Sequence, residues 1–278
     1  MKQNKINLRT GIVQGRLIQS PANELQWFPQ EFWEAEFFIA GTIGINYIEL
    51  IAERNYNPDN PIWSDSGIEK IKELVLRNDL SVHALCNDYV VDHALVFDSE
   101  VLEQNLRLLE RCELLGCEKL ILPLFENSEL NNENSDNFIE TLRIIANKAN
   151  ECGIRVCLET ILDGTQIIAF LNKLSHQNIS VVYDTGNRVA FGHDLAGDIR
   201  LLGKNRIAHI HIKDKNSHNQ NVLIGTGLVN FQSVFEALCD IEYDGPYTFE
   251  TQRGSDPIRT AKYNIEVINF FYCEALNR

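Results

Sequence analysis

Two hydrophobic patterns alternate along this chain of 278 residues, and together they predict a repeated strand–helix unit. Short runs of apolar, β-branched and aromatic residues are typical of buried strands, and longer segments with apolar positions three and four apart are typical of amphipathic helices. We expect strands over 9–14, 47–51, 80–85, 119–123, 154–159, 180–184, 206–214 and 247–250. We expect helices over 31–40, 68–77, 99–115, 138–150, 166–174, 197–202, 231–238 and 257–276.

The connections between these elements are unequal in length, and this asymmetry indicates the fold. Most connections from a strand to the next helix are long: 15–30, 52–66, 86–98, 124–136 and 214–230. Connections from a helix to the next strand are short, as at 78–79 and 116–118. In a (β/α)₈ TIM barrel the strand-to-helix loops build the active-site face. We therefore predict a single-domain TIM barrel over residues 1–278. An open doubly wound sheet is disfavoured, since 11–15 lacks the glycine-rich fingerprint of that fold.

Composition and charge limit the classes of partner that we expect this protein to bind. The net charge of −14 argues against a nucleic-acid partner, whose phosphates require basic surfaces. No apolar run approaches the ~18 residues of a membrane helix, and no apolar signal segment follows Met1. The seven cysteines form no CxxC pair and are interpreted as reduced. We expect a cytoplasmic enzyme with a small-molecule substrate, and we leave open whether it forms a homo-oligomer.

Four successive predicted strands each carry a metal-competent side chain near the C-terminal end: Glu159, Asp184, His211 and Glu250. The gaps between them are 25, 27 and 39 residues, and one strand–helix unit with its loops needs roughly 30 residues. Any one of these acids alone could be a loop or helix cap. Together they predict a divalent-metal site at the barrel mouth. Three carboxylates and one imidazole suit Mn²⁺ or Mg²⁺, with Co²⁺ as an alternative and Zn²⁺ less suited.

The predicted strand 206–214 presents polar side chains on one face, because polar and apolar residues alternate along it. His209, His211 and Lys213 share that face. His211 lies nearer the C-terminal end and is the predicted metal ligand, whereas His209 lies one layer deeper and is interpreted as a hydrogen-bonded core histidine. Lys213, one step further out, could contact a substrate hydroxyl, carboxylate or phosphate group.

The motifs around these residues resemble the xylose isomerase-like (β/α)₈ superfamily of sugar isomerases and epimerases. The resemblance rests on Glu159 and on the segments 181–187, 209–214, 225–231 and 249–250. It implies one Mn²⁺-type ion bound by Glu159, Asp184, His211 and Glu250, and two glutamates that move protons on a keto-sugar. Many relatives have a histidine at the position of Asn187. Asparagine can orient a substrate oxygen but cannot titrate, so a mechanism that needs this histidine is disfavoured.

Proton transfer through an enediolate is the chemistry that such a site predicts. A carboxylate, Glu159 or Glu250, removes a proton next to a carbonyl, and a divalent ion stabilises the resulting charge. Return of the proton by the opposite glutamate gives epimerisation, and return to the neighbouring carbon gives aldose–ketose isomerisation. The sequence does not choose between them. A dehydratase acting on a cyclic polyol or keto acid is the main alternative, and an apurinic-site endonuclease is a weaker one.

The long loops provide further candidates for substrate contact. Trp27, Phe28 and Trp63 either close over a sugar or pack the loops onto the barrel rim. Arg16, like Lys213 and Arg253, could bind an anionic group, although each of these cations could equally be salt-bridged. His83 on the third strand is either a core histidine or a substrate hydrogen-bonding group. We interpret the polar loop 126–136 as solvated rather than as a lid.

Overall fold

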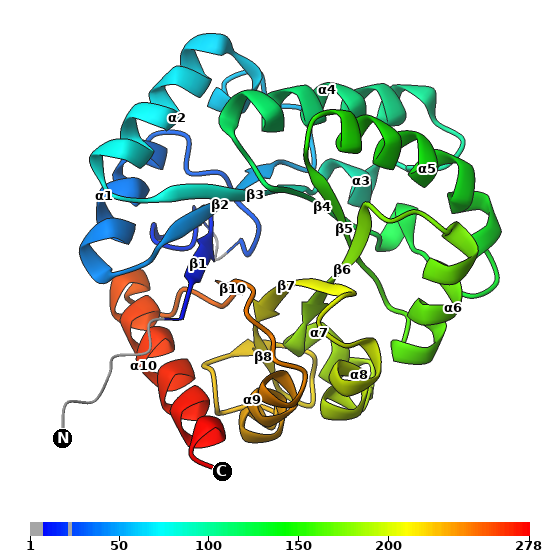
Figure 1. Cartoon of the computed structure of the whole chain (residues 1–278). Helices are drawn as coiled ribbons and strands as arrows, with labels where there is room; N and C mark the ends of the chain where they lie inside the picture. Colours follow the sequence, from blue (N-terminus) through cyan, green and yellow to red (C-terminus); the bar gives the residue numbers. More distant parts are fainter. Residues whose placement is uncertain (1–7, 22–23) are drawn as a thin grey trace.

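Eight parallel strands close into a barrel in the computed structural model, which describes residues 8–21 and 24–278 (Figure 1). Neighbouring strands in the barrel are successive in the sequence, and the last strand pairs with the first. The predicted TIM barrel is therefore confirmed. The strands are β1 (Thr10–Val13), β2 (Tyr47–Ala52), β3 (Ser81–Asn87), β4 (Lys119–Pro123), β5 (Arg155–Glu159), β6 (Ile179–Asp184), β7 (Ile207–Ile212) and β10 (Tyr247–Phe249).

An outer ring of helices surrounds the strands (Figure 1). Side chains at the beginnings of several helices satisfy free backbone N–H groups. Asp98, for example, accepts hydrogen bonds from the backbone of Glu100 and Val101 at the start of α4 (Ser99–Leu115). The α4 helix ends at Gly116 in the left-handed conformation, as glycine favours. The helices of the ring are α1 (Trp33–Ile43), α2 (Asp65–Arg77), α4 (Ser99–Leu115), α5 (Ser135–Glu151), α6 (Gly164–Leu174), α8 (Leu195–Leu202), α9 (Phe231–Asp240) and α10 (Pro257–Leu276).

The hydrophobic core has two parts, because alternate strand residues face opposite sides of the barrel wall. Outward-facing residues such as Ile210 and Ile212 of β7 belong to the large core between strands and helices. A smaller cluster includes Val13, Cys86 and Val182. The inward face of β7 holds His209 and His211. The alternation predicted for this strand is confirmed.

Several short helices and strands lie within the connections that were predicted to be loops. They are α3 (Tyr89–Asp92), α7 (Thr185–Ala190), the 3₁₀ helices η2 (Pro61–Trp63) and η3 (Glu126–Ser128), and the antiparallel pair β8 (Asp214–Lys215) and β9 (Asn221–Val222). The Asp184 carboxylate accepts a hydrogen bond from Asn187 N at 2.6 Å, and helix α7 begins directly after it.

The predicted strand over 206–214 was too long at its C-terminal end, since β7 stops at Ile212. Asp214 begins the β8–β9 hairpin, and its carboxylate accepts hydrogen bonds from the backbone of Gly225, Gly227 and Val229 at 2.8–3.1 Å. A Cβ atom on Gly227 would lie 2.3 Å from the Asp214 carboxylate, so this position requires glycine. The glycine-containing segment 225–231 therefore folds around Asp214.

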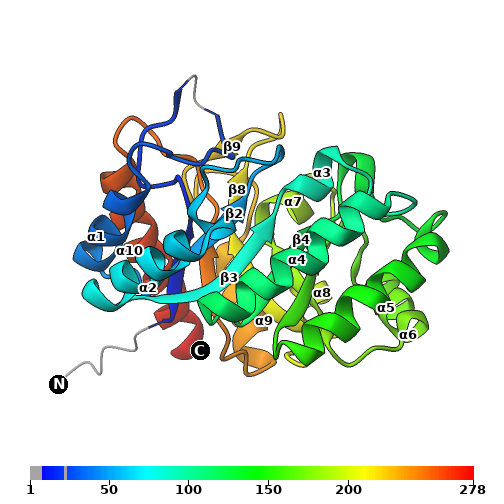
Figure 2. The same cartoon turned by 90° about the horizontal axis from the view of Figure 1, so that it is seen from above.

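The added elements gather at one end of the barrel. Figure 2 shows the β8–β9 hairpin, α3 and α7 at the end opposite the C-terminus. This is the end to which the C-terminal ends of the parallel strands point, where the active sites of TIM barrels lie. In the part of the chain that the structure describes, no helix is long and apolar enough to cross a membrane.

Candidate active site

The four predicted metal-competent side chains converge at the C-terminal ends of their strands. Glu159 ends β5, Asp184 ends β6, His211 lies on β7 and Glu250 follows β10. One ligand atom from each lies within 4.8 Å of the others. Strand register brings two of them together directly, because Asp184 pairs with His211 between β6 and β7. All four side chains are buried.

The geometry of this cluster fits a divalent ion. His211 Nδ1 lies 3.2 Å from Glu250 Oε2, 3.6 Å from Glu159 Oε2 and 3.9 Å from Asp184 Oδ2. This buried nitrogen has no well-aligned hydrogen-bond partner among the described residues, although buried polar atoms normally have one. Carboxylates crowded together in the protein interior repel one another unless a positive charge lies between them. The donor set is the one that oxygen-preferring divalent ions bind.

Lys213 supplies positive charge to the cluster. Its ammonium lies 3.0 Å from Asp184 Oδ2 and 2.7 Å from Glu250 Oε2. Burial opposes the charged form, but the neighbouring carboxylates raise the pKa of Lys213 above its ordinary value. Lys213 therefore lies against the cluster itself, one residue beyond the end of β7.

The two glutamates have different electrostatic surroundings. Burial, together with the charges of Asp184 and Glu250, raises the pKa of Glu159 to about 8. Burial acts in the same direction on Glu250, but Lys213 and His211 hold its pKa well below the ordinary value. Unequal pKa values in a close carboxyl pair are typical of sites in which one group donates a proton and the other accepts it.

Each glutamate is also oriented by its own amide donor. Asn187 Nδ2 donates to Glu159 Oε1 at 2.8 Å, and Gln26 Nε2 donates to Glu250 Oε1 at 3.2 Å. The Gln26 side chain is itself fixed, because Arg16 Nη2 donates to its Oε1 at 2.6 Å. Arg16 is buried and lies 3.7 Å from Glu250, so it contributes to the charge balance of the cluster.

Glu49 on β2 is a part of the site that the sequence analysis missed. It is fully buried, and His211 Nε2 donates to its Oε1 at 3.0 Å. Its other oxygen lies 2.7 Å from Nε2 of His209. The histidines hold the pKa of Glu49 below its ordinary value despite burial. A single acid within the apolar strand Tyr47–Ala52 was the available signal, since buried charges are almost always paired.

The deeper histidines lie below the cluster. His209 Nε2 lies 2.8 Å from Thr248 Oγ1, and burial lowers the pKa of His209 to about 4. His83 stacks on His209 with ring centroids 5.7 Å apart and contacts Lys119 Nζ at 2.7 Å. Of the two interpretations of His83, a core histidine or a substrate hydrogen-bonding group, its complete burial fits the core histidine. It lies near the beginning of β3, which runs on to Asn87, and therefore at the opposite end of the barrel.

Two residues of the loops that were predicted to contact substrate, Arg253 and Trp27, also have structural partners. Arg253 donates hydrogen bonds to the backbone oxygens of Gly15, Glu24 and Leu25 at 2.5–3.1 Å. Its guanidinium therefore joins the loop after β1 to the loop after β10. The Trp27 ring lies under this guanidinium at 5.9 Å. Binding of an anionic group by Arg253 stays a prediction.

The other two aromatic candidates are buried rather than free to close over a substrate. Phe28 is 5% exposed and belongs to the smaller core cluster. Trp63 is 8% exposed and packs against Tyr56 with ring centroids 5.3 Å apart. For these two residues the packing interpretation is correct.

The segment 126–136 begins with η3, and Arg54 contacts Glu126 at 2.9 Å.

A cavity of about 490 Å³ opens above the cluster. Its lining includes Glu159, His211 and Glu250 of the cluster, together with Asn187 and Lys213. Pockets of several hundred Å³ with converging polar groups are typical of small-molecule sites. A buried cluster of acids beneath a cavity at this end of the barrel is the arrangement typical of TIM-barrel active sites.

Comparison with known proteins identifies the family. The family model described as xylose isomerase-like TIM barrel matches residues 37–270, and the chain belongs to this family. L-ribulose-5-phosphate 3-epimerase UlaE of Shigella flexneri serotype 5b (strain 8401) is 24% identical over 244 residues, covering 82% of this chain and 85% of that protein. The resemblance inferred from the sequence motifs is thus confirmed, and the relatives include sugar epimerases.

Two solved structures extend the comparison to three dimensions. The structure of an L-ribulose 3-epimerase superposes with a TM-score of 0.77 at 20% identity, covering 97% of this chain and 96% of that one. The IOLI protein, whose structure contains a bound zinc atom, superposes with a TM-score of 0.71 at 17% identity, covering 97% and 98%. At these identities the likeness establishes the shared fold.

Proposed function

We propose that this protein is a divalent-metal-dependent epimerase of a keto-sugar. The observation that carries the proposal is the cluster of Glu159, Asp184, His211 and Glu250 beneath a cavity. Strands β6 and β7 separate β5 from β10 in the barrel, so Glu159 and Glu250 reach the cavity from different sides. Two carboxyl groups in this arrangement can serve opposite faces of one carbon atom, as epimerisation requires.

These four residues would hold the ion, and Mn²⁺ is the ion we propose for them. When bound, the ion would lower the energy of the enediolate by withdrawing charge from the sugar oxygens. One glutamate removes the proton from the carbon next to the carbonyl, and the other glutamate returns a proton to the opposite face. Asn187 and Gln26 keep the two carboxyl groups in position. Lys213 lies at the cavity wall, where it can donate a hydrogen bond to a sugar oxygen.

Solvent-proton exchange tests this function. The metal-loaded protein is incubated in D₂O with L-ribulose and, separately, with L-ribulose 5-phosphate, the substrates suggested by the relatives' names. We expect deuterium at C3 and a C3 epimer by NMR, both abolished by EDTA and restored by Mn²⁺. Loss of water with a new ultraviolet chromophore would instead identify a dehydratase. Nicking of abasic DNA without sugar exchange would identify a nuclease.

Glu49 makes a separate prediction about metal affinity. An acceptor for the second ring nitrogen of a metal-binding histidine orients the ring, and its loss typically weakens metal binding 10–100-fold. Glu49→Gln preserves the size of the side chain but removes the charge opposite His211. We expect Mn²⁺ to bind about 10–100-fold more weakly in isothermal titration. Glu118→Gln is the matched control, because Glu118 contacts His83 at the other end of the barrel. Equal affinities in the wild type and Glu49→Gln would contradict this role.

A further inference from the structure

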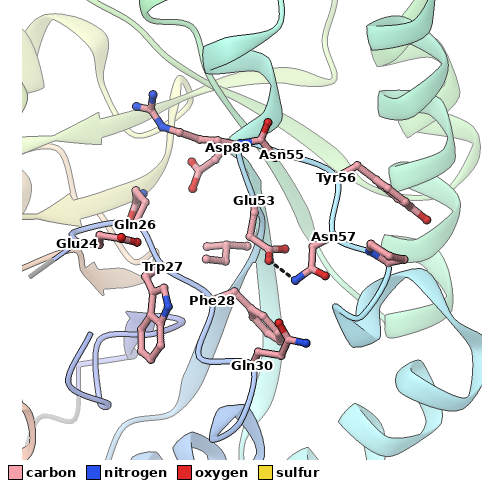
Figure 3. A pocket seen from close by; sticks show the side chains of 13 residues that line it. Glu24, Gln26, Trp27, Phe28, Gln30, Glu53, Asn55, Tyr56, Asn57 and Asp88 are labelled. Atoms are coloured by element: carbon pink, nitrogen blue, oxygen red, sulfur yellow. Dashed lines mark hydrogen bonds between the residues drawn. The ribbon is translucent and has the colours of Figure 1, made fainter. Parts of the chain in front are cut away.

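A second cavity of about 540 Å³ lies between two loops of the barrel (Figure 3). One wall is the β1 loop from Glu24 to Gln30, and the facing wall is the β2 loop from Glu53 to Pro58. The residues that line both cavities are Gln26, Arg54 and Asp88. The two spaces therefore adjoin, and a molecule bound over the acid cluster can extend past these residues into the second cavity.

The lining of this second cavity combines aromatic surfaces with polar groups. Figure 3 shows Trp27 on the β1 side and Tyr56 on the β2 side, with amide side chains between them. The carboxylate of Glu53 is fixed by donations from Asn57 Nδ2 at 2.7 Å and Asn60 Nδ2 at 2.6 Å. Sugars present C–H surfaces to aromatic rings and hydroxyl edges to carboxylates and amides, so this lining suits a sugar ring.

Asp88 marks the boundary between the two cavities. It follows β3 and is 3% exposed. Its Oδ1 contacts only Cys86 Sγ, at 3.5 Å, among the hydrogen bonds of the described chain, and its Oδ2 has no partner there. A buried acceptor without a donor is costly. A hydroxyl group of a ligand that crosses from one cavity to the other would supply the missing donor.

The charges around the second cavity disfavour a phosphate group. Glu24, Glu53 and Asp88 contribute carboxylates to its lining. Among the described residues that line this cavity, the cation is Arg54, which already forms ion pairs with Asp92 at 2.8 Å and Glu126 at 2.9 Å. An anionic substituent would therefore meet carboxylates without an available guanidinium, whereas an uncharged polyol would not be repelled.

We infer that the second cavity is a sugar-binding subsite, and that the substrate is a ketose carrying an uncharged glycosyl substituent. This inference rests on the proposed function for the reacting ketose at the acid cluster. The adjoining cavities, the aromatic lining and the unpartnered carboxylate of Asp88 determine the class of the substituent. A sugar phosphate would leave the aromatic surfaces of this cavity unused.

Binding of three ketoses with the same core tests the inference. D-fructose, D-fructose 6-phosphate and isomaltulose differ at C6, which carries a hydroxyl, a phosphate or a glucosyl group. Dissociation constants are measured by isothermal titration on the Mn²⁺-loaded protein. We expect isomaltulose to bind at least about tenfold more tightly than D-fructose, and the phosphate to bind no more tightly than D-fructose. Equal constants for isomaltulose and D-fructose, no detectable binding of isomaltulose, or tightest binding of the phosphate would overturn the inference.

Variants of the lining residues test whether the second cavity produces the higher affinity for isomaltulose. Tyr56→Ala and Asp88→Asn should each reduce the preference for isomaltulose over D-fructose. Phe38→Ala is the control, because it removes an aromatic ring that is 67% exposed on α1, away from the lining residues. It should leave the preference unchanged. An unaltered preference in both cavity variants would place the glucosyl group elsewhere and contradict the inference.

The binding experiment separates this inference from the proposed reaction. If isomaltulose binds with the expected preference but no sugar exchanges protons with D₂O, the epimerase proposal fails and the subsite stands. If D-fructose or L-ribulose exchanges protons while isomaltulose gains no affinity, the subsite fails and the epimerase proposal stands.

Discussion

Epimerisation should fall by about 10²–10⁴-fold when either Glu159 or Glu250 is replaced by glutamine, the usual effect of losing a positioned acid or base. Glutamine retains the size of the side chain and one oxygen that can face an ion, but it cannot take up or release the proton. The measurement is the turnover rate on the sugar that exchanges fastest, with the metal content of each preparation determined by elemental analysis. Rates are compared at equal metal occupancy, because both glutamates belong to the ion-binding cluster.

A control variant and a second measurement complete this experiment. Glu129→Gln changes a carboxylate that lines the same cavity but lies outside the cluster, and it should change turnover little. In D₂O, a variant with one working glutamate can still exchange the substrate proton from a single face. Full turnover by Glu159→Gln or Glu250→Gln at normal metal occupancy would show that the replaced glutamate is only an ion ligand.

His211→Ala is expected to lose most of its bound metal, whereas His209→Ala should retain it. The first change removes the Nδ1 atom that faces Glu159, Asp184 and Glu250. Even the loss of a group that merely orients a metal-binding histidine weakens affinity by about 10–100-fold, so the loss of the ligand itself should exceed 100-fold. Elemental analysis after dialysis and titration with Mn²⁺ measure both variants.

The cost of His209→Ala should appear in stability. His209 is buried below the cluster, and its removal leaves Glu49 Oε2 and Thr248 Oγ1 with one neighbour fewer. An unsatisfied buried polar group costs about 1–3 kcal/mol, which thermal or urea unfolding can detect. Metal loss in His209→Ala with metal retention in His211→Ala would mean that the deeper group of Glu49, His209 and His211 is the ion site.

The sequence by itself determined the barrel and the positions of the cluster. Strand periodicity places His209 and His211 on one face of β7, and the spacing of strand-end acids brings Glu159, Asp184 and Glu250 to one end of a parallel barrel. These features follow from local rules, because side chains alternate along every strand and successive parallel strands end at the same edge. The long strand-to-helix connections likewise marked the face at which the cavity lies.

Only the tertiary structure decided which groups complete the site. Glu49 and His211 lie 162 positions apart in the chain, and Gln26 and Glu250 lie 224 apart, so no local pattern could pair them. The role of Arg253 depends on backbone oxygens of the β1 loop that its guanidinium reaches. The depth of His83 depends on where β3 begins and ends within the barrel. Hydrogen bonds between distant segments are set by how the closed barrel brings its strand ends and loops together, and the residue types alone do not specify that arrangement.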